Sequence, residues 1–443
     1  MRFTFWCHLP IHDKEAFMNP SCWSEKMTNQ TTEYCPECGH KMESVPGYVT
    51  WCEECNWNID PDWRPISSLG LVERLNYRMG VKKSQLLLEE NLHTDRITYP
   101  LTWRKALAYL LAGSILAGTF SLPIIAVYWF FYSNSLLLTM LAIVPFLLFT
   151  DLMLPSRWRL SGQPLRREEY PGLYRLADDI AAAVQAPPID EIRMTNSYNA
   201  YFTKFGRRRT KIIGIGVPLF SALSLSEKIA ILAHETAHHA HKDVTRSWFI
   251  VSARRIMASW YEFVYPYCEE GEALRPISTP MRYAQLQLAN LIFILYYGLG
   301  ITVWDESQRA EYLADRVAGE IAGTDAACSA LSKSHFAPVF WLTAEQIARY
   351  RFNSDLFGEF RQKMEHVPAS EQKRIQRIRD SITVQLDSTH PPTPYRLQSL
   401  QHHQVLTPRY VPDSNLKNQL EEEFARLEEI SQRYLLNDIR AAL

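Results

Sequence analysis

The sequence carries no excess of either charge. Its 443 residues include 47 basic and 48 acidic side chains, which gives a formal net charge of −1. A nucleic-acid binder neutralises phosphates with a strongly basic surface, and this balance does not supply one. We therefore expect no nucleic-acid partner. The length exceeds that of a usual single domain and indicates two or three structural units.

Cysteines are scarce, and the N-terminus has no long apolar run. Eight cysteines are too few for the disulfide framework of a secreted protein of this length, so a reducing compartment is favoured. In the opening residues, MRFTFWCHLPIHDKEAF, polar and charged residues interrupt the apolar ones before a signal peptide could form. The sequence also lacks internal repeats and long low-complexity segments, which excludes solenoid architectures.

Two long apolar stretches are present further along the chain. Residues 106–132 contain no charged residue, and residues 136–154 contain only Asp151. Each stretch is long enough to cross a bilayer, for which about 20 apolar residues suffice. Only SNS separates them, so residues 101–155 are predicted to form an antiparallel transmembrane helical hairpin. A buried helical pair in a soluble core is the alternative, but helices that are apolar on every face are rare in water.

The basic residues near this hairpin lie on its two flanks and not at its tip. They are Arg104, Lys105, Arg157, Arg159, Arg166 and Arg167. By the positive-inside rule both flanks face the cytoplasm. We expect an integral protein of the cell inner membrane, with the lipid bilayer as a partner and the other domains on the cytoplasmic side. Two further stretches, 248–267 and 286–304, either span the membrane or form core helices.

Four histidines lie in residues 231–243, ILAHETAHHAHKD. Upstream of them, Ser224 and Glu227 have the spacing of a capping box, which predicts a helix that begins near Leu225. Apolar residues follow at helical spacing, as expected for a helix packed on a core. The histidines are therefore expected on a helix.

Helical geometry separates these histidines. His234 and His238 project from one face a turn apart and can bind one metal ion, whereas His239 points away from that face. His241 returns to the face but lies two turns, roughly 10 Å, beyond His234. Glu235 completes the H-E-x-x-H pattern of zinc peptidases, in which the glutamate takes a proton from water. A surface helix with ordinary polar residues is the alternative, and this short motif alone does not decide.

The downstream segment ESQRAEYLADRVAGEIAG also has helical periodicity. It offers Glu311 and Asp315 one turn apart on one face, so that one carboxylate can bind the metal while the other stands behind a ligand. Two carboxylates on a helix are usually only solvated. Beside an H-E-x-x-H helix, however, they become candidate ligands.

Together these segments resemble the family of membrane-associated zinc metallopeptidases that contains HtpX and the CAAX prenyl peptidases. The shared pattern is H-E-x-x-H-x-x-x-x-D followed by E-x-x-x-D, here His234, Glu235, His238, Asp243, Glu311 and Asp315. The resemblance implies that Glu311 is the third zinc ligand and that Asp315 and Asp243 support the ligands. It also implies a mostly helical α+β zincin (gluzincin) fold for an HtpX-like peptidase domain at residues 156–405.

Two weaker segments extend the resemblance. NSYNAYFT resembles the family's Asn-Ala segment and implies that Asn199 and Ala200 lie on an edge strand that pairs with the substrate backbone. STHPPTPYRLQSL resembles its His-Pro-Pro segment and implies that His390 and Arg396 stabilise the oxyanion. A turn residue at Asn199 and a loop residue at His390 are the alternatives.

The chain also departs from the family pattern. Thr236 and Ala237 stand where a glycine is common, and Arg254 and Arg255 interrupt the second hydrophobic region. Since the zinc ligands must meet at one ion, the chain between His238 and Glu311 has to cross the bilayer an even number of times.

The N-terminal region, residues 1–100, contains C-x2-C, thirteen residues, and a second C-x2-C. This spacing predicts a four-cysteine zinc ribbon at about residues 33–58, with ligands Cys35, Cys38, Cys52 and Cys55. So small a unit has no hydrophobic core, and zinc would supply its folding energy. Four thiolates leave no open coordination position, which favours a structural or recognition role over redox chemistry.

The sequence therefore favours a membrane-anchored zinc endopeptidase with one catalytic and one structural Zn²⁺. The resemblance implies polypeptide substrates, membrane or misfolded proteins, and a role in membrane protein quality control. The alternative is a non-catalytic membrane adaptor or metal sensor that uses the ribbon to bind a partner. Residues 406–443 are expected to form a C-terminal amphipathic helix whose charges face solvent, and a partner-binding helix is the alternative.

Overall fold

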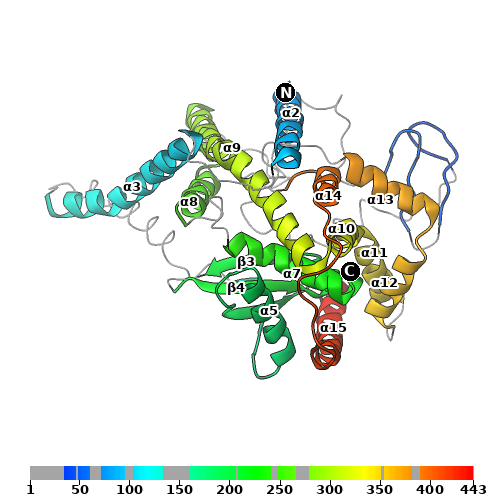
Figure 1. Ribbon diagram of the computed structural model, residues 1–443. Coiled ribbons are helices and arrows are strands. Elements are labelled where there is room, and N and C mark those ends of the chain that lie inside the picture. Colours follow the sequence, from blue (N-terminus) through cyan, green and yellow to red (C-terminus); the bar gives the residue numbers. More distant parts are fainter. Residues whose placement is uncertain are drawn as a thin grey trace.

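The computed structural model describes residues 34–45, 48–59, 71–94, 103–132, 160–205, 208–240, 248–265, 279–350, 354–381 and 390–442. Within these ranges the chain is mostly helical and contains a four-stranded sheet (Figure 1). The expectation of a mostly helical α+β chain is confirmed. The second helix of the expected hairpin, residues 136–154, lies outside the described residues, as do His241 and Asp243.

The sheet has the strand order β1-β2-β4-β3. Its strands are β1 (Gln163–Leu165), β2 (Glu191–Thr195), β3 (Ala200–Phe205) and β4 (Thr210–Gly216). β2 and β4 run parallel, while β1 and β3 pair with them in the antiparallel sense. β4 is central and mostly buried, and its apolar run IIGIG suits a strand covered on both faces. β3 lies at the edge, with Ala200 as its first residue and Asn199 immediately before it.

Helix α7 (Leu225–Ala240) carries the H-E-x-x-H motif and packs against β3. Its start follows the predicted capping box. The backbone N–H of Ser224 donates to Glu227 Oε2 at 2.7 Å, and the N–H of Glu227 donates to Ser224 Oγ at 3.4 Å. These bonds satisfy two of the N–H groups that a helix leaves open at its start. The helix begins at Leu225, as the sequence predicts.

The main core lies between the sheet, α7 and the helices α5 (Pro171–Ala183), α6 (Val217–Ala222) and α15 (Ser414–Ala442). The apolar stripe of α15 is buried in this core through Leu416, Leu420, Leu427, Leu435, Leu436 and Ile439. Its Glu423 carboxylate accepts the N–H groups of Gly172 and Leu173, each at 2.8 Å, at the start of α5. The C-terminal helix is therefore part of the main core, and most of its other charged side chains are exposed.

A second group of helices covers the side of the molecule opposite α3 in Figure 1. It comprises α10 (Thr324–Lys333), η4 (Ser334–Phe336), α11 (Ala337–Tyr350), α12 (Leu356–Glu365), α13 (Ala369–Ser381) and α14 (Thr393–His402). Aromatic rings join this group to the sheet region. Phe340 and Phe360 pack edge to face with 5.1 Å between ring centroids, and Tyr198 packs against Phe360. α10 and α14 pack on α9, which places them next to the metal-binding helices.

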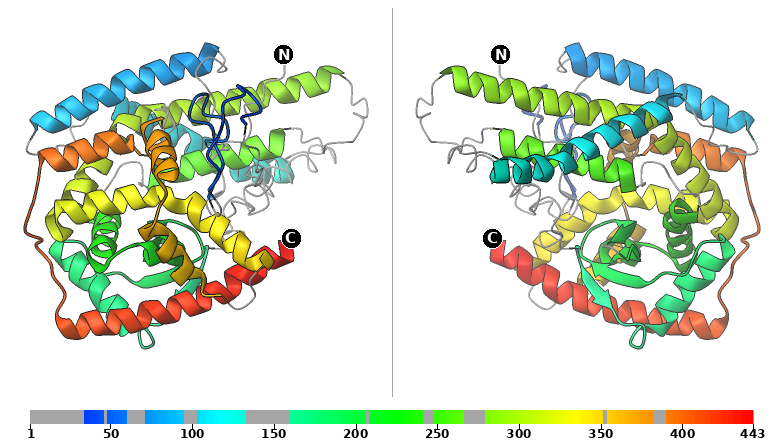
Figure 2. Two further views of the ribbon diagram at one scale, coloured as in Figure 1. Left: turned by 90° about the vertical axis from the view of Figure 1, so that its right-hand side faces the viewer. Right: turned by 90° about the vertical axis from the view of Figure 1, so that its left-hand side faces the viewer.

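Three helices extend from the sheet region: α3 (Trp103–Tyr132), α8 (Trp248–Val264) and α9 (Thr279–Ala322) (Figure 2). In the described part of the chain, α3 and the stretch Arg282–Ala322 of α9 are long and apolar enough to cross a membrane. Only about a quarter of their most apolar windows is buried, 24% and 28%. A core helix of a soluble protein would be mostly buried, so this exposure favours contact with lipid.

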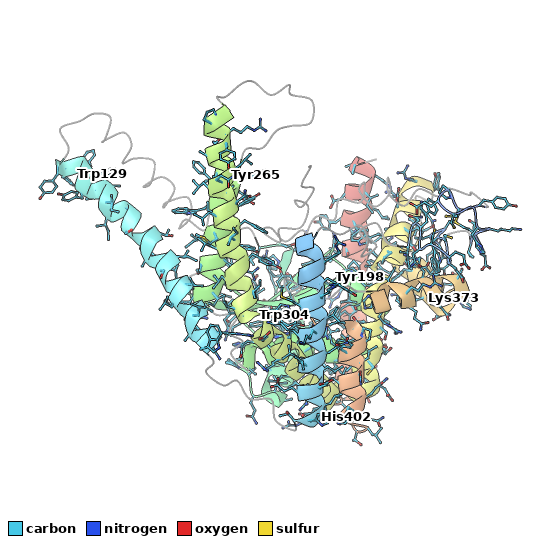
Figure 3. All side chains as sticks on the ribbon, turned by 90° about the horizontal axis from the view of Figure 1, so that it is seen from above. Trp129, Tyr198, Tyr265, Trp304, Lys373 and His402 are labelled. Atoms are coloured by element: carbon cyan, nitrogen blue, oxygen red, sulfur yellow. The ribbon has the colours of Figure 1, made fainter. Side chains whose placement is uncertain are left out.

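α8 and α9 form an antiparallel pair. Ile250 near the start of α8 packs with Val303, while Tyr261 near its end packs with Ala289. The chain thus runs away from the metal-binding helix α7 along α8 and returns along α9. Figure 3 shows Tyr265, just past α8, and Trp129 of α3 far from Trp304. This out-and-back path is what an even number of crossings between His238 and Glu311 requires.

The apolar part of α9 ends in an acidic pair, Asp305 and Glu306, within one continuous helix. Asp305 pairs with Lys83 at 3.0 Å and with Arg104 at 2.5 Å. Lys83 belongs to helix α2 (Leu71–His93), and Arg104 begins α3. These pairs tie three helices together at one level, six residues before Glu311.

Candidate metal centre

Two histidines of α7 and one glutamate of α9 converge in the interior. The Nε2 atoms of His234 and His238 are 3.2 Å apart. Glu311 places Oε2 3.4 Å from His234 Nε2 and Oε1 3.2 Å from His238 Nε2. All three residues are buried, and their ligand atoms lie within 4.8 Å of one another.

These distances fit a zinc ion. Zinc bound to nitrogen and oxygen ligands at about 2.0–2.1 Å in a tetrahedron places the ligand atoms about 3.3–3.4 Å apart. The three separations between His234, His238 and Glu311 lie at or close to this value. Three protein ligands also leave the fourth position of a tetrahedron for a water molecule or a substrate, as in catalytic zinc sites.

A chain of polar contacts stands behind His234. Its Nδ1 lies 3.0 Å from Asp315 Oδ1. Asp315 in turn accepts two hydrogen bonds from Arg396, one from Nε at 2.7 Å and one from Nη2 at 2.6 Å. Burial disfavours a charge on His234, but its hydrogen bonds to Asp315 and Glu311 outweigh burial and raise the pKa of His234 to about 9. The arrangement orients the ring so that Nε2 faces the metal position.

Glu235 is buried and turned toward the sheet. Its Oε2 accepts the backbone N–H of Phe202 at 3.0 Å. Phe202 pairs with Ile213 of β4, and because its N–H points at Glu235, it points away from β4 toward the outer edge of the sheet, where no further strand pairs with β3 in the described part of the chain. The carboxylate between the two histidines thus lies beside the strand edge to which an extended peptide could add. The sequence does not point to Phe202, because its contribution is a backbone N–H, which almost every residue type carries.

His390 and Arg396 both come close to Glu311 but in different environments. His390 lies two residues before Pro392, the N-cap of α14, and its Nδ1 is 2.7 Å from Glu311 Oε2. Its side chain is 50% exposed. Arg396 is buried, and its Nη2 lies 3.8 Å from the same oxygen while Nε and Nη2 both donate to Asp315. His390 therefore borders the open side of the centre, and Arg396 stands behind it.

His239, which the helical geometry excludes as a ligand, and Asn199, which the resemblance assigns to the substrate strand, both lie outside the ligand group. His239 stacks flat on Phe202, with 4.7 Å between ring centroids and 15° between planes. Its two ring nitrogens are buried and find no hydrogen-bond partner among the described residues. Asn199 uses its side-chain oxygen to accept the N–H of Ala200 at 2.8 Å. Neither His239 nor Asn199 takes part in the three-ligand group.

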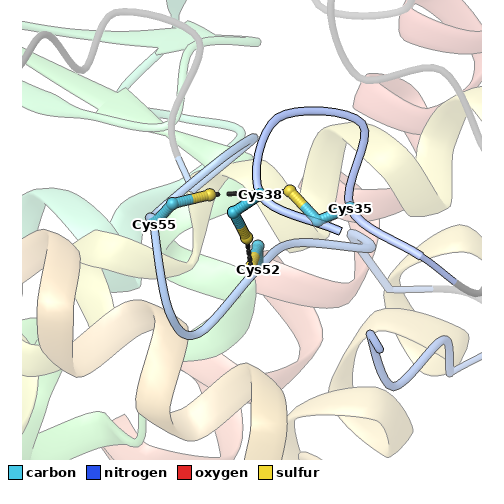
Figure 4. Close-up of side chains that lie close together, drawn as sticks. All are labelled: Cys35, Cys38, Cys52 and Cys55. Carbon is cyan, nitrogen blue, oxygen red and sulfur yellow. Dashed lines mark hydrogen bonds between the residues drawn. The ribbon is translucent and has the colours of Figure 1, made fainter. Parts of the chain in front are cut away.

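The four N-terminal cysteines also gather into one group (Figure 4). The Sγ atoms of Cys35 and Cys55 are 3.5 Å apart, as are those of Cys38 and Cys52. Zinc bound to four thiolates at about 2.3 Å would set these atoms about 3.8 Å apart, so the group is of the size that zinc needs. Burial opposes ionisation of Cys35, but neighbouring backbone N–H groups lower the pKa of Cys35 to about 7. A thiolate is thus available near neutral pH.

Each cysteine pair sits in a turn of the same kind. The N–H of Gly39 donates to the carbonyl of Cys35 at 2.9 Å, and the N–H of Asn56 donates to that of Cys52 at 3.0 Å. Gly39 and Asn56 have positive φ values of 73° and 60°, which glycine and asparagine tolerate best. The two turns present their sulfur atoms to one point, as expected for a ribbon built on two knuckles.

Comparison with known proteins adds an independent line of support. A family model described as Peptidase family M48 matches residues 171–404, slightly more than half of the chain, and this range includes both metal-binding helices. Protease HtpX homolog 1 of Streptomyces coelicolor is 28% identical over 178 residues, which cover 39% of this chain and 55% of that protein. The chain thus spans about half the length of this curated relative. No solved structure matches the chain.

Proposed function

Because this chain belongs to peptidase family M48, we propose that it is a membrane-anchored zinc endopeptidase with its catalytic centre at His234, His238 and Glu311. The observation that carries the proposal is the position of Glu235. It lies between two converging histidines and beside the open edge of β3, where a peptide backbone can bind. A metal sensor needs ligands but has no use for a carboxylate placed at a strand edge.

The chemistry follows from the donor set. A zinc ion held by these ligands would supply Lewis-acid activation of a water molecule and of the scissile carbonyl. Glu235 takes the proton from that water and passes it to the leaving amine. Asp315 and Arg396 hold His234 in the orientation that the metal requires.

The resemblance implies an oxyanion role for His390 and Arg396, and in this proposal the two residues contribute to it differently. His390 borders the open side and donates to the oxyanion through its exposed face. Arg396 is already bound to Asp315 through two nitrogens, so it contributes its positive charge from behind.

We propose that substrates add to β3 as an extra strand. The backbone groups of Ala200, Phe202 and Lys204 point away from β4, because every second residue of an antiparallel strand faces the same side. The N–H of Phe202 binds Glu235 in this structure, so an added strand would replace that bond. A peptide on that edge would carry its scissile carbonyl past Glu235. Asn199 would then end the strand and hold Ala200 in place.

The substrates that fit this architecture best are membrane or misfolded proteins, as in membrane protein quality control. Helix α9 runs without a break from its exposed apolar part to Glu311, so the centre lies near the level at which the helix leaves the apolar layer. Together with α3, it would anchor an integral protein of the inner membrane, with the peptidase domain and ribbon in the cytoplasm.

The test uses the full chain in lipid nanodiscs with an unfolded, membrane-anchored substrate. We expect zinc-dependent cleavage that falls about 10²–10⁴-fold in Glu235→Gln while zinc stays bound. Glu320→Gln is the matched control, because Glu320 is exposed on α9 beyond the metal ligands, and it should keep full activity. Undiminished cleavage by Glu235→Gln would refute the mechanism. Absence of zinc-dependent cleavage by the wild type would instead favour the adaptor or sensor.

A further inference from the structure

The cysteine ribbon, residues 34–45 and 48–59, is docked on the peptidase domain. Its Tyr48 hydroxyl donates to a carbonyl of α12 at 3.0 Å. On α13, Arg377 donates to the backbone of the second knuckle and to Asn56 Oδ1 at 2.8 Å. The guanidinium of Arg377 also lies over the ring of Trp51, 5.2 Å from its centroid. The ribbon therefore lies against the domain through both of its halves and is not a free appendage.

One buried arginine joins the two parts. Arg374 of α13 has no exposed surface, and it binds both oxygens of Glu371 at 2.7 Å. Its Nη1 donates to the carbonyl of Ile59 at 2.6 Å, at the end of the ribbon. A buried guanidinium that loses a partner costs several kcal/mol, about 3–5, of stability. The buried state of Arg374 thus depends on a ribbon that is folded in place.

α13 lies on the path to the metal centre. Its Ile375 belongs to the main core, and the helix packs against η4 and against α14, which carries Arg396. His335 of η4 contacts the Thr393 hydroxyl at 2.9 Å, at the first residue of α14. α13 ends nine residues before His390. The helix that carries the ribbon is therefore adjacent to the segment that supplies His390 and Arg396.

Helix α2, which follows the ribbon in sequence, contacts the same segment from another side. Asn91 donates to Ser399 of α14 at 2.5 Å and accepts from Arg316 of α9 at 2.8 Å. Leu88 packs with Trp304 in a separate apolar cluster between α2 and α9. The N-terminal region consequently contacts α14 through α13 and through α2, and α14 cannot shift without breaking contacts to one of them.

From this arrangement we propose that the ribbon is a positioning module for the metal centre and that Arg374 is the residue that transmits its effect. Metal bound by the four cysteines holds the knuckles together and places Ile59 against Arg374. The contact between Ile59 and Arg374 fixes the positions of α13 and α14. Because α14 carries Arg396, it also fixes the contacts from Arg396 to Asp315 and from Asp315 to His234. The two metal sites are therefore coupled, and binding at each raises affinity at the other by the same factor. The coupling itself concerns metal binding, and only its effect on cleavage rests on the proposed function.

The experiment titrates the full chain in nanodiscs with Co²⁺ alone, in place of zinc. Co²⁺ held by four thiolates has an intense sulfur-to-metal absorption that a histidine-carboxylate site lacks, so the two sites are read separately. In Cys52→Ser and in Arg374→Met we expect the affinity of the histidine site for Co²⁺ to fall about tenfold or more. This is the lower end of the decrease in metal affinity that follows the loss of residues supporting the ligands. Lys373→Ala is the control, because the exposed Lys373–Glu53 pair contributes little (Figure 3).

Reciprocity supplies a second test that does not alter the ribbon. His238→Ala removes a ligand of the histidine site, and we expect the affinity of the thiolate site for Co²⁺ to fall by the same factor as in the forward experiment. Peptide cleavage measured in parallel should lose kcat more than KM in Arg374→Met. Unchanged affinity of each site when the other is disabled would overturn the coupling. A chain that shows the coupling but no cleavage would instead refute the peptidase proposal alone.

Discussion

The carboxylate of Glu235 accepts the backbone N–H of Phe202 at 3.0 Å and so joins the metal-binding helix to the edge strand. One side chain therefore stands at both the proposed reaction centre and the substrate edge. The contact also ties α7 to β3, since Glu235 is buried and its charge would be costly without such a donor.

Two substitutions of Glu235 should separate chemistry from structure. Glutamine can still accept the N–H of Phe202 through its amide oxygen but cannot take a proton, whereas alanine does neither. We expect both to lose cleavage to a similar extent, while only Glu235→Ala unfolds at lower temperature, with a loss of about 1–3 kcal/mol. Thermal unfolding of the zinc-loaded proteins measures the difference. Equal stabilities for both variants would show that the hydrogen bond to Phe202 contributes nothing to the fold.

The support behind His234 gives a second prediction. Asp315→Asn weakens the acceptor of His234, and Arg396→Met leaves the Asp315 carboxylate buried without its cation. Loss of a residue that supports a metal ligand typically lowers metal affinity about 10–100-fold, so we expect zinc to bind that much more weakly in both variants. Competition with a chelator of known affinity measures the change. Arg175→Met, which removes an exposed pair with Asp413, is the control and should leave zinc affinity unaltered.

The features that the sequence predicts well are local. The capping box of Ser224 and Glu227 spans three residues, and the facing of His234 and His238 follows from the helical period alone. The contacts that the sequence does not reveal join distant residues. Arg374 lies on a helix of mostly polar residues that resembles a solvated surface helix, yet it is fully buried because Ile59, 315 residues earlier, covers it. No periodicity encodes such a contact.

For α15 and Arg396, too, a local pattern leaves a long-range contact undetermined. Residues 406–443 have the pattern of an amphipathic helix, and this pattern does not say whether the apolar stripe meets the chain's own core or a partner. The structure shows that the apolar stripe is buried in the chain's own core. Likewise, the His-Pro-Pro segment indicates that Arg396 belongs to the centre, but its pairing with Asp315, 81 residues away, depends on how α14 packs on α9.

The pKa of His234 leads to a pH dependence. In the metal-free protein this pKa is raised from 6.5 to about 9. A raised pKa means that the folded state binds the proton more tightly, so the contribution to stability is full below pH 6.5 and is lost as pH rises through 9. Zinc must displace this proton, and its affinity should therefore increase about tenfold per pH unit between pH 6.5 and 8.5.

Chelator competition at several pH values measures that slope. Asp315→Asn provides the comparison, because it removes a cause of the raised pKa and should flatten the dependence above pH 7. If zinc affinity of the wild type did not change over this interval, His234 would not hold a proton in the metal-free centre.

His239 offers a prediction of increased stability. Its ring is buried against Phe202, and neither nitrogen has a hydrogen-bond partner among the described residues. Phenylalanine would keep the stacked ring and remove two unsatisfied polar atoms, so His239→Phe should stabilise the fold by about 1 kcal/mol. The variant should also bind as much zinc per chain as the wild type, since His239 is no ligand. Metal analysis and thermal unfolding test both points, and loss of one zinc would place His239 in a metal site.

Membrane insertion of α9 can be tested with one charge on its exposed apolar surface. Leu291 and Ile294 are 53% and 63% exposed, which in water would make either position tolerant of arginine. At the centre of a spanning helix, arginine costs about 2.5–3.5 kcal/mol. We therefore expect Leu291→Arg to lower the fraction of chain that resists alkaline extraction from membranes. Tyr350→Arg, at a position on α11 that is 77% exposed, should extract like the wild type. Equal resistance of both variants would mean that this surface of α9 does not face lipid.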